Sequence, residues 1–178
     1  MSFERSDAPG ELRKVELFCN SAKFRSAEDA LITQASAALW LKAHDMDTGN
    51  PSRKEHEQLI TFRETVRDFL GGRATGNAVA TLNKFAKSTL GGAQWTPDGE
   101  PVLPAKRANG TDALIGSLLA ILFAAGQTGE LDRLKTCHNP ECRYVFYDRS
   151  PSKNGIWCST DFCGEKPQPR PHRARHIR

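Results

Sequence analysis

The sequence predicts a mainly α-helical protein with short β-hairpins, in which an N-terminal helical domain precedes a small treble-clef-like finger at the C-terminus. Two observations lead to this fold class. Several long segments repeat their apolar residues at spacings of three and four, as one face of a helix requires. Four of the five cysteines lie close together in the last third of the 178 residues. Such a module is too small to build a core unaided.

The first predicted elements are a short strand and a helix. Val15, Leu17 and Cys19 alternate with polar neighbours, which is typical of a strand over residues 12–19. The next segment, residues 33–44, begins with a threonine that can cap a helix and contains several apolar residues. We therefore expect a strand followed by a helix at the start of the first domain.

Three longer helices complete the predicted core. Residues 52–70 form the clearest one, because Ser52 opens a capping box and apolar residues recur every three or four positions. Residues 77–90 repeat this pattern, and a glycine pair follows each of the two segments. Residues 111–125 are apolar on nearly every side, which predicts a central core helix.

The remaining elements are short. A proline-first, glycine-later turn predicts a hairpin near residues 94–104. Residues 131–134 form a turn of helix that leads into the cysteines. We therefore place the domain boundary there, with residues 1–130 as the helical domain and residues 131–178 as the finger with its basic Pro/Arg-rich tail.

Positive charge is concentrated in the second domain. Residues 1–130 hold 15 basic and 16 acidic side chains, whereas residues 131–178 hold 10 basic and 5 acidic ones. Local charge density of this kind attracts polyanions such as nucleic acid. Positive charge is densest in residues 165–178, where Glu165 is the one acidic residue. The basic residues there are Lys166, Arg170, Arg173, Arg175 and Arg178, interleaved with His172 and His176.

The clustered cysteines are interpreted as metal ligands. The start of the chain lacks the pattern of a secretory signal, and no apolar run approaches the ~20 residues of a membrane span. We therefore expect a reducing cytoplasm, where thiols persist and no membrane is involved. The spacing C-x4-C, fifteen residues, C-x4-C fills the four positions of one structural zinc ion with Cys137, Cys142, Cys158 and Cys163.

Helix geometry restricts how the second pair reaches the metal. Residues five apart lie about 140° apart around a helix axis, so Cys158 and Cys163 cannot both project from one helix body. We expect Cys158 to end a strand or turn, one of residues 159–161 to cap a helix, and Cys163 to reach the ion from the first turn. The first pair should close a turn between short strands, one of them within residues 143–148.

Other interpretations of these residues are weaker. The four cysteines could be merely buried thiols, but their paired spacing argues against this. His138 beside Cys137 could replace a ligand, although turn histidines are mostly solvated. Cys19 is interpreted as a small packing residue. His44, His56, His172 and His176 have no nucleophile beside them and no glycine-rich phosphate loop occurs, so the chain is not expected to be an enzyme.

At these residues the sequence resembles a known family of bacterial proteins with an N-terminal ABATE domain and a C-terminal CGNR-type zinc finger, described as stress-induced transcription regulators. In the first domain the resemblance rests on residues 15–21 and on Trp40-Leu41. In the finger it rests on Leu131-Asp132-Arg133-Leu134, Cys137, Pro140, Cys142, Phe146, Asp148, Ser150, Trp157-Cys158-Ser159, Cys163-Gly164 and His172-Arg173-Ala174-Arg175.

The chain departs from this family at two places. Glu165 and Lys166 replace the Asn and Arg of the Cys-Gly-Asn-Arg motif, so a planar bidentate fork is lost. The basic segment of the family resembles a continuous helix, whereas Pro167, Pro169 and Pro171 disfavour a helix here. We expect the helix to end near Lys166 and an extended tail to display the arginines.

These features predict a zinc-dependent, DNA-binding transcription regulator of the bacterial cytoplasm, associated with the nucleoid. The helical domain is expected to sense a small-molecule effector or to form a homodimer. The alternative is a non-enzymatic protein-interaction or ligand-sensing protein with a purely structural zinc finger. Contacts to the phosphates of double-stranded DNA are assigned to Lys166, Arg170, His172, Arg173, Arg175, Arg178, Arg149 and Lys153.

Overall fold

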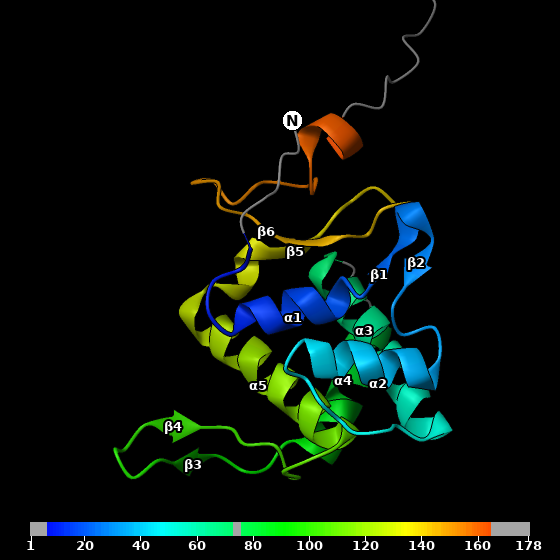
Figure 1. Cartoon of the computed structure of the whole chain (residues 1–178). Helices are drawn as coiled ribbons and strands as arrows, with labels where there is room; N and C mark the ends of the chain where they lie inside the picture. The colour runs from blue at the N-terminus through cyan, green and yellow to red at the C-terminus, as the bar shows by residue number, and fades with distance from the viewer. Residues whose placement is uncertain (1–6, 73–75, 165–178) are drawn as a thin grey trace, which may run out of the picture.

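The fold is mainly helical, with short antiparallel strand pairs, in the computed structural model, which describes residues 7–72 and 76–164. Its α-helices are α1 (Leu12–Cys19), α2 (Gln34–Ala43), α3 (Arg53–Leu70), α4 (Gly76–Thr89) and α5 (Thr111–Thr128) (Figure 1). Its strands pair as β1 (Ala22–Lys23) with β2 (Glu28–Asp29), β3 (Gln94–Trp95) with β4 (Pro101–Val102), and β5 (Leu134–Thr136) with β6 (Val145–Tyr147). Shorter helical turns are η1 (Phe24–Ser26), η2 (Leu131–Arg133) and η3 (Thr160–Gly164).

The segment predicted as the N-terminal strand, residues 12–19, is instead the helix α1, so that prediction is wrong. Val15, Phe18 and Cys19 are at most 1% exposed, because helical spacing brings them to one side. That side packs against α3 and α5. The alternation that suggested a strand depends on Leu17, which is only partly buried. The strand period of two residues and the helix period of 3.6 residues both fit an eight-residue segment, so tertiary packing decides which structure forms.

The predicted starts of two helices are confirmed by their capping bonds. Thr33 Oγ1 accepts a hydrogen bond from the backbone N–H of Ser36 at 3.1 Å at the start of α2. At the start of α3, Glu55 Oε2 accepts from the backbone N–H of Ser52 at 2.8 Å, and the Ser52 hydroxyl accepts from the Glu55 N–H at 3.4 Å. These bonds satisfy backbone donors that the first turn of a helix leaves unpaired.

Helix α5 is the central core helix that its composition predicts. It packs against α1, α3 and α4, and its Ile115 and Leu118 are almost fully buried. Phe62 of α3 extends this core, with its ring centroid 5.9 Å from that of Phe18 and 5.3 Å from that of Phe85. By length and mean hydropathy α5 could also cross a membrane, although 44% of its most apolar window is buried inside this fold.

The predicted hairpin near residues 94–104 is present as β3 and β4, with Gln94 opposite Val102. It extends away from the helices as an arm (Figure 1). The side chain of Trp95 on this arm is 68% exposed. The arm therefore adds nothing to the main core.

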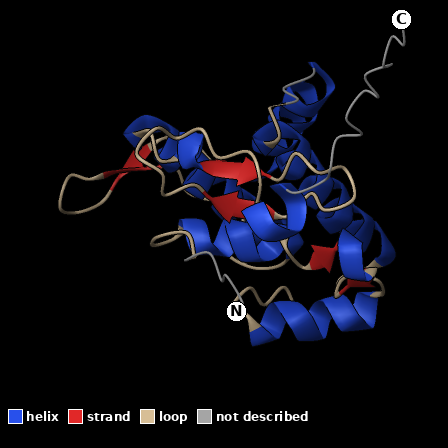
Figure 2. Ribbon diagram, turned by 90° about the horizontal axis from the view of Figure 1, so that it is seen from above, coloured by secondary structure: helices blue, strands red, loops and turns tan. Residues whose placement is uncertain are grey.

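Strand β6 connects the two parts of the molecule. Seen from above, the β5–β6 pair lies across the helices (Figure 2). Val145 and Tyr147 belong to the core formed with the helices. Phe146, between them, belongs to a second buried cluster formed around the cysteines. Because successive side chains of a strand point to opposite faces, this single strand serves both clusters.

Candidate metal centre

The first cysteine pair lies in a tight turn between β5 and β6, as predicted. The N–H of Cys137 donates to the carbonyl of Tyr144 at 2.8 Å, and the N–H of Cys142 donates to the carbonyl of Asn139 at 2.9 Å. The buried Asn139 side chain also accepts from the N–H of Glu141 at 3.0 Å. These bonds close the turn and direct both sulfurs to the same side.

The second pair is held by the short helix η3. Cys158 precedes it, and Cys163 lies within it. The carbonyl of Ser159 accepts from the N–H of Cys163 at 3.0 Å, and its hydroxyl accepts from the N–H of Phe162 at 3.4 Å. This confirms Ser159 as the capping residue, within the three that the spacing left open.

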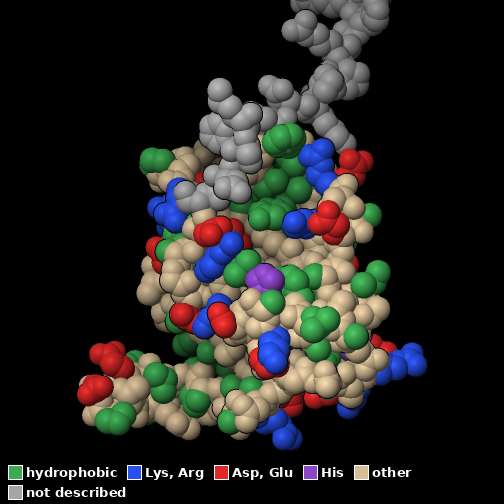
Figure 3. Space-filling view, viewed as in Figure 1, with side chains coloured by type: hydrophobic (Ala, Val, Ile, Leu, Met, Phe, Trp, Pro, Cys, Tyr) green, Lys and Arg blue, Asp and Glu red, His purple; other side chains and the backbone are tan. Residues whose placement is uncertain are grey.

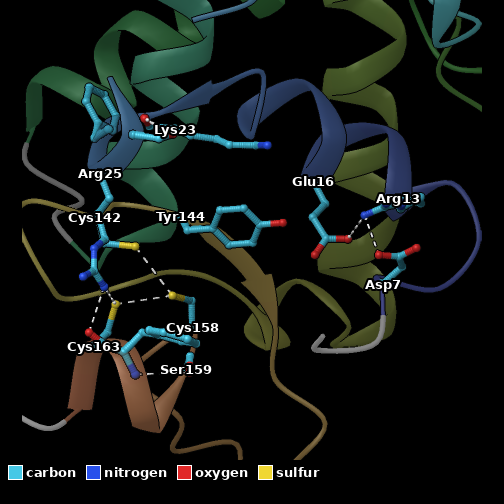
Figure 4. A pocket seen from close by; sticks show the side chains of 13 residues that line it. Asp7, Arg13, Glu16, Lys23, Arg25, Cys142, Tyr144, Cys158, Ser159 and Cys163 are labelled. Atoms are coloured by element: carbon cyan, nitrogen blue, oxygen red, sulfur yellow. Dashed lines mark hydrogen bonds and ion pairs between the residues drawn. The ribbon is translucent and has the colours of Figure 1, made fainter. Parts of the chain in front are cut away.

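The four sulfurs form a cluster of the right size for zinc. All four lie within 4.8 Å of one another, and the Cys142–Cys158 and Cys158–Cys163 sulfur pairs are 3.5 and 3.6 Å apart. A tetrahedral zinc ion with Zn–S bonds of about 2.3 Å requires sulfurs about 3.8 Å apart. Three of these cysteines converge in Figure 4. The donor set formed by Cys137, Cys142, Cys158 and Cys163 therefore fits one zinc ion, which these four residues could hold.

Hydrogen bonds within the cluster shift the pKa values of its thiols in opposite directions. Hydrogen bonds from Cys142 and Cys158 lower the pKa of Cys137 to about 2, against the effect of burial. The hydrogen bond to Cys137 raises the pKa of Cys142 to about 12, and similar bonds to Cys137 and Cys142 raise the pKa of Cys158. Four adjacent thiols cannot all ionise beside one another unaided. A divalent cation stabilises the four thiolates by replacing the shared protons.

His138, which was considered as a possible ligand, and Cys19, the fifth cysteine, both lie outside the cluster. His138 is exposed, and its ring centroid lies 6.3 Å from that of Trp157 in an edge-to-face contact. Cys19 is 0% exposed in the helical core, and burial raises the pKa of its thiol to about 12. The interpretation of Cys19 as a packing residue is thus confirmed, because a protonated buried thiol behaves as a small apolar group.

Asp148 organises the loop between the two cysteine pairs. Its carboxylate accepts from Lys135 Nζ at 2.9 Å, from the N–H of Ser150 at 3.0 Å and from the N–H of Gly155 at 2.7 Å. Burial opposes ionisation, but these bonds hold the pKa of Asp148 well below its usual range. The sequence signal for this role was the Asx-turn pattern Asp148-x-Ser150.

Three contacts dock the finger on the helical domain, and sequence patterns revealed none of them. Asn20, which caps the C-terminus of α1, donates from Nδ2 to the carbonyl of Val145 at 2.7 Å and accepts from its N–H at 2.9 Å. Arg143 donates to Asp68 of α3 at 2.6 Å. The hydroxyl of Thr136 donates to the carbonyl of Arg67 at 2.7 Å.

A fourth contact reaches the metal ligands themselves. Arg25 Nη1 of η1 donates to the carbonyl of Phe162 at 2.8 Å and lies 3.6 Å from Cys163 Sγ. It lines one side of a cleft of about 870 Å³ between the finger and the first helical segment (Figure 4). An exposed arginine in a short loop carried no sequence signal for this position.

The predicted nucleic-acid contacts fall into two groups. Arg149 is exposed, but its guanidinium donates to the carbonyl of Asp7 at 2.8 Å and lies 5.3 Å from the Tyr147 ring centroid. Lys153 is exposed in the turn after Asp148. The other predicted contacts lie outside the described residues: Lys166, Arg170, His172, Arg173, Arg175 and Arg178.

Most of the described basic side chains of the finger already hold the fold together. Arg133 donates to the carbonyls of Asp148 and Ser150, and Lys135 forms an ion pair with Asp148. Arg143 and Arg149 are bonded to the helical domain and to the N-terminal segment, as described above. On the face seen in Figure 3, basic side chains are interspersed with acidic ones and form no continuous basic patch.

Two family models match the chain. Residues 16–130 match the ABATE family, described as "Putative stress-induced transcription regulator". Residues 133–176 match the CGNR zinc finger. A comparison with curated proteins finds no match.

Proposed function

The chain belongs to the ABATE family of transcription regulators, and from this premise we propose that it is a DNA-binding regulator whose basic tail contacts phosphates. The match to the CGNR zinc finger, residues 133–176, includes most of that tail. The family assignment also favours a cytoplasmic location. The observation that carries the proposal is the charge of the chain beyond Gly164.

Zinc acts in this proposal as a structural ion. The protein fills all four positions with sulfur, so no position remains open for water or a substrate. The ion would hold together the turn after β5 and the helix η3, which share few other bonds. We propose that the regulator has no enzymatic activity.

The tail is the best source of phosphate contacts. Four of the five basic side chains within residues 131–164 are bonded inside the protein. The side chain of Lys153 is exposed, and the sequence beyond Gly164 adds five further lysines and arginines. In that part of the sequence a single acidic residue, Glu165, accompanies the basic residues Lys166, Arg170, Arg173, Arg175 and Arg178.

The proposal predicts a steep salt dependence of DNA binding. A labelled random-sequence duplex is titrated with zinc-loaded protein between about 50 and 200 mM salt, and anisotropy is measured. Five phosphate contacts should give a slope of log K against log salt of roughly −4.5, since each contact contributes about −0.9. Replacing the four tail arginines with glutamine should bring the slope close to −1.

A matched variant controls for the loss of charge. Four exposed basic residues of the helical domain are replaced with glutamine and should leave the slope unchanged: Lys42, Arg53, Lys54 and Lys87. Binding that ignores salt, or that survives intact in the tail variant, would contradict the proposal.

A protein-interaction role is the second candidate. Glu165 and Lys166 replace the amide and the arginine of the family motif, which weakens close phosphate recognition. The absence of any duplex binding at low salt would support this alternative. In either case we propose that the helical domain senses a small-molecule effector or forms a homodimer, and sedimentation analysis of the full chain tests the dimer directly.

A further inference from the structure

A zinc ion bound to four thiolates has a net charge of about −2, so the surrounding protein must supply donors to the sulfurs. The first cysteine pair receives them from backbone N–H groups, including that of Cys158, which donates to Cys137. Backbone N–H groups of Asn139 and Tyr144 donate to Cys137 and Cys142, respectively. These backbone donors offset part of the negative charge on the two sulfurs.

Cys163 receives its donor from a distant part of the chain. The guanidinium of Arg25, 138 positions away, reaches Cys163 Sγ at 3.6 Å and donates to the neighbouring Phe162 carbonyl at 2.8 Å. Figure 4 shows Arg25 extending from its loop to this cysteine. Arg25 thus supplies, from outside the four cysteines, a side-chain hydrogen bond to one of their sulfurs. The positive charge of Arg25 is opposite in sign to the net negative charge of the zinc–thiolate cluster, so the two attract each other.

The loop that carries Arg25 is anchored to the helical core. Arg67 of α3 is 0% exposed, donates to the carbonyls of Cys19 and Ala22, and lies 4.7 Å from the centroid of the Phe24 ring. Arg143 of the finger lies 5.3 Å from the same ring. A contiguous set of contacts thus leads from α3 through η1 to the metal ligands.

We propose that Arg25 is an outer-shell residue of the zinc centre, contributed by the helical domain, and that it couples zinc retention to docking of the finger. Zinc favours the docked arrangement, because the thiolates it holds attract Arg25. Docking favours zinc, because Arg25 neutralises part of the cluster. Such coupling acts equally in both directions.

The first test measures zinc release from the full chain into excess chromogenic chelator. Arg25→Gln should release zinc roughly ten-fold faster than the wild type, the usual scale for loss of an outer-shell partner. Arg25→Lys, which keeps the charge, should fall between the two. Arg53→Gln is the matched control, because Arg53 is exposed and pairs with Glu57 on the surface of α3, and it should release zinc at the wild-type rate.

A spectroscopic readout separates this role from a merely structural one. Loss of an N–H···S bond leaves more electron density on the sulfur, so Arg25→Gln should move the sulfur-to-metal charge-transfer band of the cobalt-substituted protein to longer wavelength. An unmoved band together with release at the Arg53→Gln rate would overturn the proposal.

The second test addresses the coupling. Asp68→Asn removes one of the two negative charges that Arg143 faces on α3, the other being Glu64, without altering the finger. It should also speed zinc release, and in the double variant with Arg25→Gln the effects should combine to less than their product, because both act through one docked state. Simple multiplication of the two effects would overturn the coupling and confine Arg25 to a local role.

Discussion

At the scale of single residues, the Asn20 side chain makes the hydrogen bonds that a neighbouring strand would make to β6. Its amide both donates to and accepts from the backbone of Val145, as a neighbouring strand would do. This edge of β6 would otherwise leave two buried polar groups without partners. Asn20 lies within the N-terminal segment that resembles the family, and the structure assigns it a docking role.

Asn20→Ala should lower the free energy of unfolding by about 1 to 3 kcal/mol, because both backbone groups of Val145 lose their partner in a half-buried place. Urea unfolding followed by circular dichroism measures the change. Asn50→Ala, at an exposed loop position, is the control and should alter stability by less than about 0.5 kcal/mol. Equal effects of the two substitutions would show that the Asn20 amide contributes nothing to docking.

At the scale of elements, the long helices follow from local patterns whereas the short ones depend on their neighbours. α3 begins at its capping box and ends at Gly71, as expected from residues 52–70. α1 has eight residues and no side-chain cap, so only packing against α3 and α5 makes it a helix. Close approach of α5 to the end of α4 is a further feature that composition did not predict.

The two glycines of α5 test this close approach. A Cβ at Gly116 would lie 2.8 Å from both the Thr89 carbonyl oxygen and Ala105 Cβ, whereas at Gly126 its nearest contact would be Leu131 Cδ2 at 3.7 Å. Gly116→Ala should therefore destabilise the protein by about 1 to 3 kcal/mol.

Gly126→Ala is the matched control on the same helix. It should be neutral or should stabilise the protein by up to about 1 kcal/mol, because alanine favours a helix over glycine. Thermal unfolding of both variants measures the difference. Equal melting temperatures would contradict the close contact at Gly116.

At the scale of the whole molecule, the finger and the helical domain share β6. Val145 and Tyr147 stabilise the helical core, while Phe146 packs in the cysteine cluster. The zinc centre is therefore not an appendage on a linker. Loss of the metal should disturb one face of this strand and leave the other in place.

Chelation should accordingly loosen only part of the finger. Hydrogen exchange should increase in residues 137–144 and 156–164, which the ion holds together, while Val145 and Tyr147 retain protection from the helical core. A non-chelating isomer of the chelator serves as the control. Loss of protection throughout β5 and β6 would contradict the shared-core arrangement.

The sequence by itself determined the four zinc ligands, the long helices and the hairpin arm. Cysteine spacing is sufficient because four thiolates have one geometry in common, and capping boxes and apolar periods act within a few residues. Only the tertiary structure decided that residues 12–19 form a helix and that Asn20, Arg25 and Arg143 join the two domains. These roles depend on contacts between residues up to 138 positions apart. Local sequence patterns extend over only a few residues and therefore cannot predict such contacts.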